Sequence, residues 1–129
     1  MSKFGTYLVN GEAGNVGMAG APVLHFSLLV VSGTGKVSGH AMISQALGAN
    51  SEKQINNVTG EIHGAGLGPV TKLVALSGTY YETLTPPAIG TIEVPFQATL
   101  AVDDAWTGKG GFTCGSVKVE NVPVEKVAL

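Results

Sequence analysis

The chain has 129 residues, of which 44% are hydrophobic and 12% are charged, and its net charge at pH 7 is -2. This length is typical of one domain, and the composition excludes intrinsic disorder, which requires few apolar and many charged residues. The seven basic residues are all lysines and face nine acids, so the positive surplus that nucleic-acid binding requires is missing. We expect a single β domain over residues 1–129 that binds no nucleic acid.

The cysteine content and the apolar segments indicate the compartment. Cys114 is the one cysteine, which excludes an internal disulfide and fits a reducing environment. The first residues lack the apolar run of roughly 7–15 residues of a signal peptide. No segment approaches the roughly 20 apolar residues of a membrane helix. We therefore expect a cytoplasmic protein that contacts no membrane.

Alternation of apolar and polar residues with a period of two recurs along the chain and predicts strands. The first predicted strand covers residues 4–10. The glycine-containing segment Gly11–Ala21 is expected to be a loop or a glycine-rich interruption of a strand, and a loop of this kind can close over a ligand. The segment Val23–Val31 is apolar on both faces, so we expect this strand to be central or covered on both sides.

The middle of the chain contains the clearest alternation. Strands are predicted for Lys36–Leu47, for Gln54–His63 and for Val70–Tyr81. In Thr91–Val102 one face is wholly apolar and the other is mostly polar. Pro95 lies on the outer face of that strand and cannot donate a ladder hydrogen bond, so we expect an edge or a bulge there.

Two last strands are predicted for Gly111–Val119 and Val122–Val127, which makes about eight in all, with no convincing helix. This pattern predicts an all-β fold, either an antiparallel β-sandwich or a flattened β-barrel, because both produce the same alternation. A glycine also recurs two residues after a large apolar residue in or near the predicted strands, at Gly39, Gly60, Gly78 and Gly108. We interpret these glycines as bulges or close-packing points where a sheet curves, which favours a barrel-like shape.

Residues for catalysis or metal binding are not grouped along the sequence. His25, His40 and His63 match no zinc spacing, so we expect no metal and no cofactor. His25 is expected to be a hydrogen-bonded structural histidine. Cys114 has no basic neighbour that would lower its pKa, and no serine occupies a nucleophile elbow. No acid–base–nucleophile set can be assembled from neighbouring residues, and we expect that the protein is not an enzyme.

Aromatic residues give the one positive indication of a surface function. Tyr80 and Tyr81 are adjacent on a predicted strand, and Trp106 follows Asp103 and Asp104 in a predicted turn. An exposed tryptophan near tyrosines and acids can stack on a sugar ring or on a partner protein. These five residues are therefore the ligand-binding candidates. In the alternative interpretation, Trp106 caps one end of the core.

Several short strings resemble a known family. They are Gly20–His25, Gly35–Gly39, Asn57–His63 and Pro86–Gly90. The chain resembles a small bacterial family about one domain long, classed as a domain of unknown function. The resemblance implies a bacterial, stand-alone β domain and brings no catalytic or binding residues with it.

Two functional hypotheses follow. The first is a non-catalytic binding or interaction module that associates with itself as a homo-oligomer. The segment Val23–Val31 has a second apolar face and the chain carries few charges, and a second copy of the chain is the commonest partner that buries such a face. The second is a β domain that binds a carbohydrate or another small ligand. It would be lectin-like if it used the aromatic candidates, or lipocalin-like if the barrel enclosed an apolar cavity.

Overall fold

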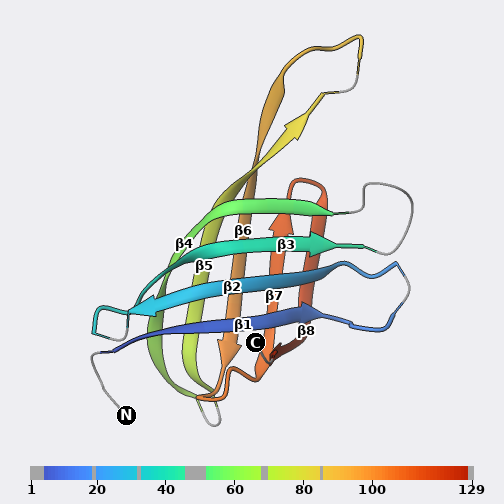
Figure 1. The fold of residues 1–129 in the computed structure, drawn as a ribbon. Coiled ribbons are helices and arrows are strands. Elements are labelled where there is room, and N and C mark those ends of the chain that lie inside the picture. The colour runs from blue at the N-terminus through green and yellow to red at the C-terminus, as the bar shows by residue number, and fades with distance from the viewer. Residues whose placement is uncertain are drawn as a thin grey trace.

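The computed structural model describes residues 5–18, 20–31, 33–45, 52–67, 70–84 and 86–127. These residues form eight antiparallel strands that close into a barrel, each strand pairing with the next in sequence (Figure 1). The strands are β1 (Thr6–Gly14), β2 (Val23–Val31), β3 (Lys36–Ser44), β4 (Lys53–Leu67), β5 (Val70–Thr83), β6 (Thr91–Val102), β7 (Gly108–Cys114) and β8 (Val117–Lys126). The predicted all-β class is confirmed, and of the two predicted architectures the fold is the barrel.

The barrel closes where β8 returns to β1. Residues Gly11 to Ala13 of β1 pair with Val124 to Lys126 of β8. The described residues include no helix that is long and apolar enough to cross a membrane.

The predicted strand boundaries are confirmed most closely where the alternation is longest. β2 and β6 have the predicted ends, and β3 begins at Lys36 as predicted. The expected end of that strand, Leu47, lies outside the described residues. The loop predicted for Gly11–Ala21 is wrong in its first part, because β1 continues to Gly14 and pairs with β2 throughout. A β-carbon at Gly11 would collide with the ring of Phe26, so this glycine makes room for a core side chain and does not break the strand.

The strand predicted for Gly111–Val119 is also wrong. The chain turns at Gly115 and Ser116, between the end of β7 and the start of β8. Gly115 has a φ of 63°, a conformation that two-residue hairpin turns require and glycine adopts readily. Apolar residues alternate on both sides of this turn, so the periodic pattern continues through it and hides it.

The inward faces of the strands form the core. In β2, Leu24, Phe26, Leu28 and Val30 are buried, whereas Leu29 on the outer face is 39% exposed. Of the two alternatives for β2, the central position is confirmed, because β2 pairs with β1 and β3 along its whole length, and cover on both faces is not found within the described chain. Closure into a barrel explains this outcome, because it gives every strand one interior and one exterior face.

Glycines allow neighbouring strands to approach closely at the curved parts of the sheet. A β-carbon on Gly39, Gly60 or Gly108 would overlap a backbone carbonyl oxygen of the adjacent strand, that of Ser27, Ala75 or Ala101 respectively. The register of β3 and β4 also shifts just after Gly39. The interpretation of the recurring glycines as close-packing or bulge positions is confirmed at these three sites.

Strands β5 and β6 extend beyond their other neighbours. Pairing of β5 with β4 ends at Ser77, and pairing of β6 with β7 ends at Phe96. Further out, β5 and β6 pair only with each other, up to Thr83 and Thr91. We call residues 78–84 and 86–95 the β5–β6 arm, and Figure 1 shows it projecting from the barrel. The predicted edge at Pro95 is confirmed, because this residue lies just beyond the last pair with β7.

Candidate functional site

Trp106 lies in the turn between β6 and β7, with its side chain inside the barrel. The residue is 3% exposed, and its ring centroid is 6.2 Å from that of Phe26 at an interplanar angle of 43°. Its φ of 61° is unusual for a residue other than glycine. Oδ1 of Asp103 holds the turn by accepting the N–H groups of Ala105 at 2.9 Å and Thr107 at 3.0 Å. Trp106 thus closes one end of the core, as the alternative interpretation predicted, and offers no exposed stacking face.

Asp104 connects the same turn to β5 through side-chain hydrogen bonds. Its Oδ1 accepts hydrogen bonds from Nζ of Lys72 at 2.9 Å and from Oγ1 of Thr71 at 2.8 Å. The hydrogen bond from Lys72, followed by that from Thr71, holds the pKa of the Asp104 carboxyl below its usual value. The two acids that sequence analysis assigned to a ligand therefore bond to the protein itself.

Tyr80 and Tyr81 lie at the base of the β5–β6 arm, far from Trp106. Tyr80 packs against the core, and Nζ of Lys53 is 4.9 Å from its ring centroid. Tyr81 points the other way and is 55% exposed. Lys72, which holds Asp104, precedes Tyr80 on β5 by a distance of about 26 Å at a rise of about 3.3 Å per residue. The five candidate residues thus divide between opposite ends of β5 and form no common site.

The barrel interior is occupied by large side chains. Phe26, Phe96, Phe112 and Trp106 are each at most 3% exposed. An eight-stranded barrel has an interior just wide enough for inward side chains or one small ligand. The accessible functional groups therefore lie on the outer surface.

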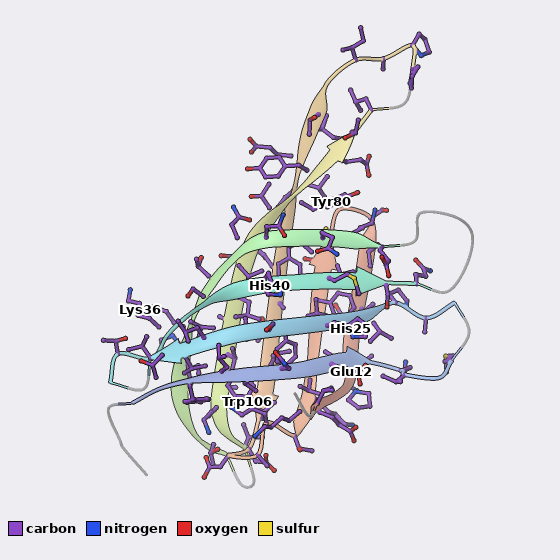
Figure 2. All side chains as sticks on the ribbon, viewed as in Figure 1. Glu12, His25, Lys36, His40, Tyr80 and Trp106 are labelled. Carbon is purple, nitrogen blue, oxygen red and sulfur yellow. The ribbon has the colours of Figure 1, made fainter. Side chains whose placement is uncertain are left out.

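A groove of about 440 Å³ crosses the outer face of β1, β2, β3 and β4. Six of its ten lining residues are polar, and the full lining comprises Asn10, Gly11, Glu12, His25, Phe26, Ser27, His40, Met42, Gln54 and Val127. The strand register places Glu12 opposite His25 and His25 opposite Met42. Oγ of Ser27 donates a hydrogen bond to Oδ1 of Asn10 at 2.6 Å. Figure 2 shows Glu12, His25 and His40 on these neighbouring strands.

A chain of polar contacts runs across three strands at one end of this face. Nε2 of His25 lies 3.0 Å from Oγ of Ser44, and Nδ1 of His25 lies 3.4 Å from Oε2 of Glu12. The prediction of a hydrogen-bonded His25 is confirmed. Sequence reasoning missed the grouping because the three residues come from β1, β2 and β3. The signal that points to it is the tight turn after β2, which sets the register of β2 and β3.

The other histidines are arranged differently. Nε2 of His63 lies 3.8 Å from Oε1 of Glu61, and both side chains are exposed. His40 is exposed on β3. Within the described residues, no three histidine, cysteine, aspartate or glutamate side chains are placed to hold a metal ion.

Cys114 is 1% exposed at the end of β7, and burial raises the pKa of its thiol. Because the thiolate is the reactive form, we expect the native protein to react with Ellman's reagent at least about 100-fold more slowly than the urea-unfolded chain. Absorbance at 412 nm measures both rates. Equal rates in the two states would contradict the burial of this thiol.

The β5–β6 arm carries several exposed apolar side chains. Tyr81 is 55% exposed, Ile89 95% and Ile92 43%. The base of the arm is fixed to the barrel, since Nζ of Lys53 lies 3.8 Å from Oε1 of Glu82 and Oδ1 of Asn57 accepts the N–H of Thr79 at 3.4 Å. The arm therefore presents two strand edges and several apolar side chains from an anchored base.

Comparison with known proteins identifies the family of this chain. No curated protein matches the chain. One family model matches residues 4–116, which include seven of the eight strands. The expected resemblance to a family of unknown function is confirmed: the chain belongs to the DUF1842 family, described as a domain of unknown function.

Proposed function

We propose that this protein is an interaction module that associates with a second copy of itself through the β5–β6 arm. The observation that carries the proposal is the pairing pattern, in which residues beyond Ser77 in β5 and before Phe96 in β6 pair only with each other. Exposed strand edges are templates for pairing with another chain. This role rests on binding alone and requires no catalytic group.

The energetics of the arm favour a partner. An isolated two-stranded hairpin is at best marginally stable in water. Burying an exposed isoleucine or tyrosine side chain contributes about 1.5–3 kcal/mol, and the arm offers Tyr81, Ile89 and Ile92. A second copy related by a two-fold axis brings the same edge and the same side chains to the contact, so both chains bury the same apolar surface.

Charge distinguishes the two edges of the arm. Glu82 on β5 is compensated by Lys53, whereas Glu93 on β6 is exposed. Pairing two β6 edges around Glu93 would bring like charges together, which is unfavourable. Pro95 also removes one hydrogen-bond donor from the β6 edge. We therefore assign the β5 edge, from Tyr81 to Thr83, to the contact between copies.

The alternative function, binding of a carbohydrate or small ligand, would have to use residues other than the buried Trp106. The groove across β1 to β4 provides polar groups for such a ligand, but the described lining includes no exposed phenylalanine, tyrosine or tryptophan. Self-association through the arm is therefore the better supported of the two functions.

Sedimentation equilibrium of a matched pair of double variants tests the proposal. The arm variant is Tyr81→Ser with Ile92→Ser, and the control is Leu8→Ser with Leu29→Ser. The control pair is 60% and 39% exposed on the outer face of β1 and β2, close to the 55% and 43% of the arm pair. We expect the dissociation constant of the oligomer to rise about 100-fold or more in the arm variant, equivalent to about 3 kcal/mol. The control is expected to match the unmodified protein.

A reversed result, in which the Leu8 and Leu29 variant dissociates and the arm variant does not, would move the interface to the face of β1 and β2. Circular dichroism of both variants confirms that the strands remain folded. A loss of association in a folded arm variant then reports on the contact itself.

A further inference from the structure

We propose that Glu12, His25 and Ser44 form an acyl-transfer site for small esters, with Ser44 as the nucleophile. The site lies on the outer face of β1, β2 and β3, away from the β5–β6 arm (Figure 2). The inference therefore goes beyond the proposed self-association and does not depend on it.

Each ring nitrogen of His25 has its own partner. Nε2 is 3.0 Å from the hydroxyl oxygen of Ser44, and Nδ1 is 3.4 Å from a carboxylate oxygen of Glu12. A carboxylate beside Nδ1 favours the tautomer that carries its proton there, which leaves the Nε2 lone pair to accept the serine proton. This order of nucleophile, base and orienting acid is the one that activates serine in acyl-transfer enzymes of unrelated folds.

The sheet register accounts for the arrangement. Glu12 lies directly opposite His25 in the neighbouring strand. Ser44 lies on the other side of β2, diagonal to His25, since Met42 is opposite His25 and Ser44 is two residues further along β3. Side chains at such positions stand on the same face and within reach of one another. Three strands of a closed barrel therefore hold the three groups on a rigid support.

The site is open to a small substrate. The side chain of His25 is 37% exposed and that of Glu12 is 28% exposed. Both residues line the groove of about 440 Å³, where Met42 and Val127 add apolar surface beside the polar groups. An ester with a short acyl chain can place that chain along the groove, with its carbonyl carbon on the Ser44 side of the imidazole.

The chemical steps need no cofactor. The Ser44 oxygen forms a bond to the ester carbonyl carbon while Nε2 of His25 takes the hydroxyl proton. The bond from carbon to the alcohol oxygen then breaks, and that oxygen leaves with the proton from His25. Water next attacks the acyl-serine with His25 again accepting a proton, which is returned to the Ser44 oxygen as the acid departs.

Covalent labelling with a fluorophosphonate probe tests this site in the full-length protein. The probe forms a phosphorus–oxygen bond to an activated serine and releases fluoride, and the serine proton passes to the base. Trypsin then gives a peptide spanning residues 37–53, which contains Ser38, Ser44 and Ser51. Fragmentation of this peptide in the mass spectrometer identifies the serine that carries the label. We expect the label on Ser44.

Variants distinguish a serine that is activated by His25 from a serine that is merely exposed to the probe. His25→Asn and His25→Gln are each expected to slow labelling about 100-fold or more, the usual contribution of a general base. Glu12→Gln is expected to slow it about tenfold, because Glu12 acts by positioning His25. The controls are His63→Asn, which changes an exposed histidine outside this groove, and Ser38→Ala, which removes another exposed serine of β3. Both controls are expected to label at the unmodified rate.

Three results would overturn the inference: no label on the unmodified protein, label distributed equally over the three serines, or unchanged labelling of folded His25 variants. The fluorescence of the single, buried tryptophan verifies that each variant is folded. Two different His25 substitutions are used, so that the test still holds if one of the variants does not fold. Hydrolysis of p-nitrophenyl acetate that survives Ser44→Ala would also contradict the role of Ser44, since the imidazole alone would then account for it.

Discussion

Replacement of Trp106 by alanine is expected to lower the free energy of unfolding by about 4 kcal/mol, the usual cost of truncating a buried aromatic residue. Trp106 is 3% exposed and packs on Phe26 at the end of the barrel. A domain of this size has a total stability of about 5–15 kcal/mol. The loss is therefore a large share of the total, and the variant is expected to unfold at a much lower urea concentration.

Urea titration followed by far-ultraviolet circular dichroism measures this loss, because the signal does not depend on the tryptophan itself. Asp104→Asn in the same turn is the matched control. Its carboxylate is exposed and pairs with Lys72 at the surface, so we expect only a small change in the free energy of unfolding. A Trp106→Ala variant as stable as this control would show that the indole does not close the barrel.

Replacement of Gly60 by alanine is expected to lower the free energy of unfolding by about 3 kcal/mol. A β-carbon at Gly60 would overlap the backbone oxygen of Ala75 and lie 2.9 Å from Cδ2 of Leu76. The Leu76 side chain is able to rotate, but the Ala75 oxygen is fixed in the β4–β5 pairing. The two strands must therefore separate locally.

Gly64→Ala, four residues further along the same strand, provides the comparison. A β-carbon at Gly64 meets no atom within 4 Å. Alanine there removes only the conformational freedom of glycine, so we expect stability to stay within about 1 kcal/mol or to rise slightly. Thermal melting of both variants decides the matter. Equal melting temperatures would mean that the approach of β4 and β5 at Gly60 is looser than the structure indicates.

The strands that were predicted most accurately have one face that is entirely apolar. β6 and β2 were predicted with their observed ends, because closure of the barrel buries alternate residues along each of them. The turn at Gly115 and Ser116 was missed, because apolar alternation continues on both sides of it. Local periodicity reports which face is buried and does not report where a chain reverses within two residues.

Properties that depend on register could not be predicted from the sequence. The length of the β5–β6 arm follows from where β4 and β7 stop pairing, and the approach of Ser44 and Glu12 to His25 follows from how three strands align. Trp106 was correctly placed in a turn, but the direction of its ring depends on its positive φ and on the Asp103 hydrogen bonds. Apart from the tight turn after β2, which sets the register of β2 and β3, these tertiary features have no local sequence signal.

Native mass spectrometry of the unmodified protein is the most direct test of self-association. We expect a mass of at least two copies of the 13.1 kDa chain, with no added mass, under conditions that preserve folded assemblies. A monomer that reproducibly carries an added mass would instead support the small-ligand function and give the weight of that ligand. A bare monomer at every protein concentration would contradict self-association through the β5–β6 arm.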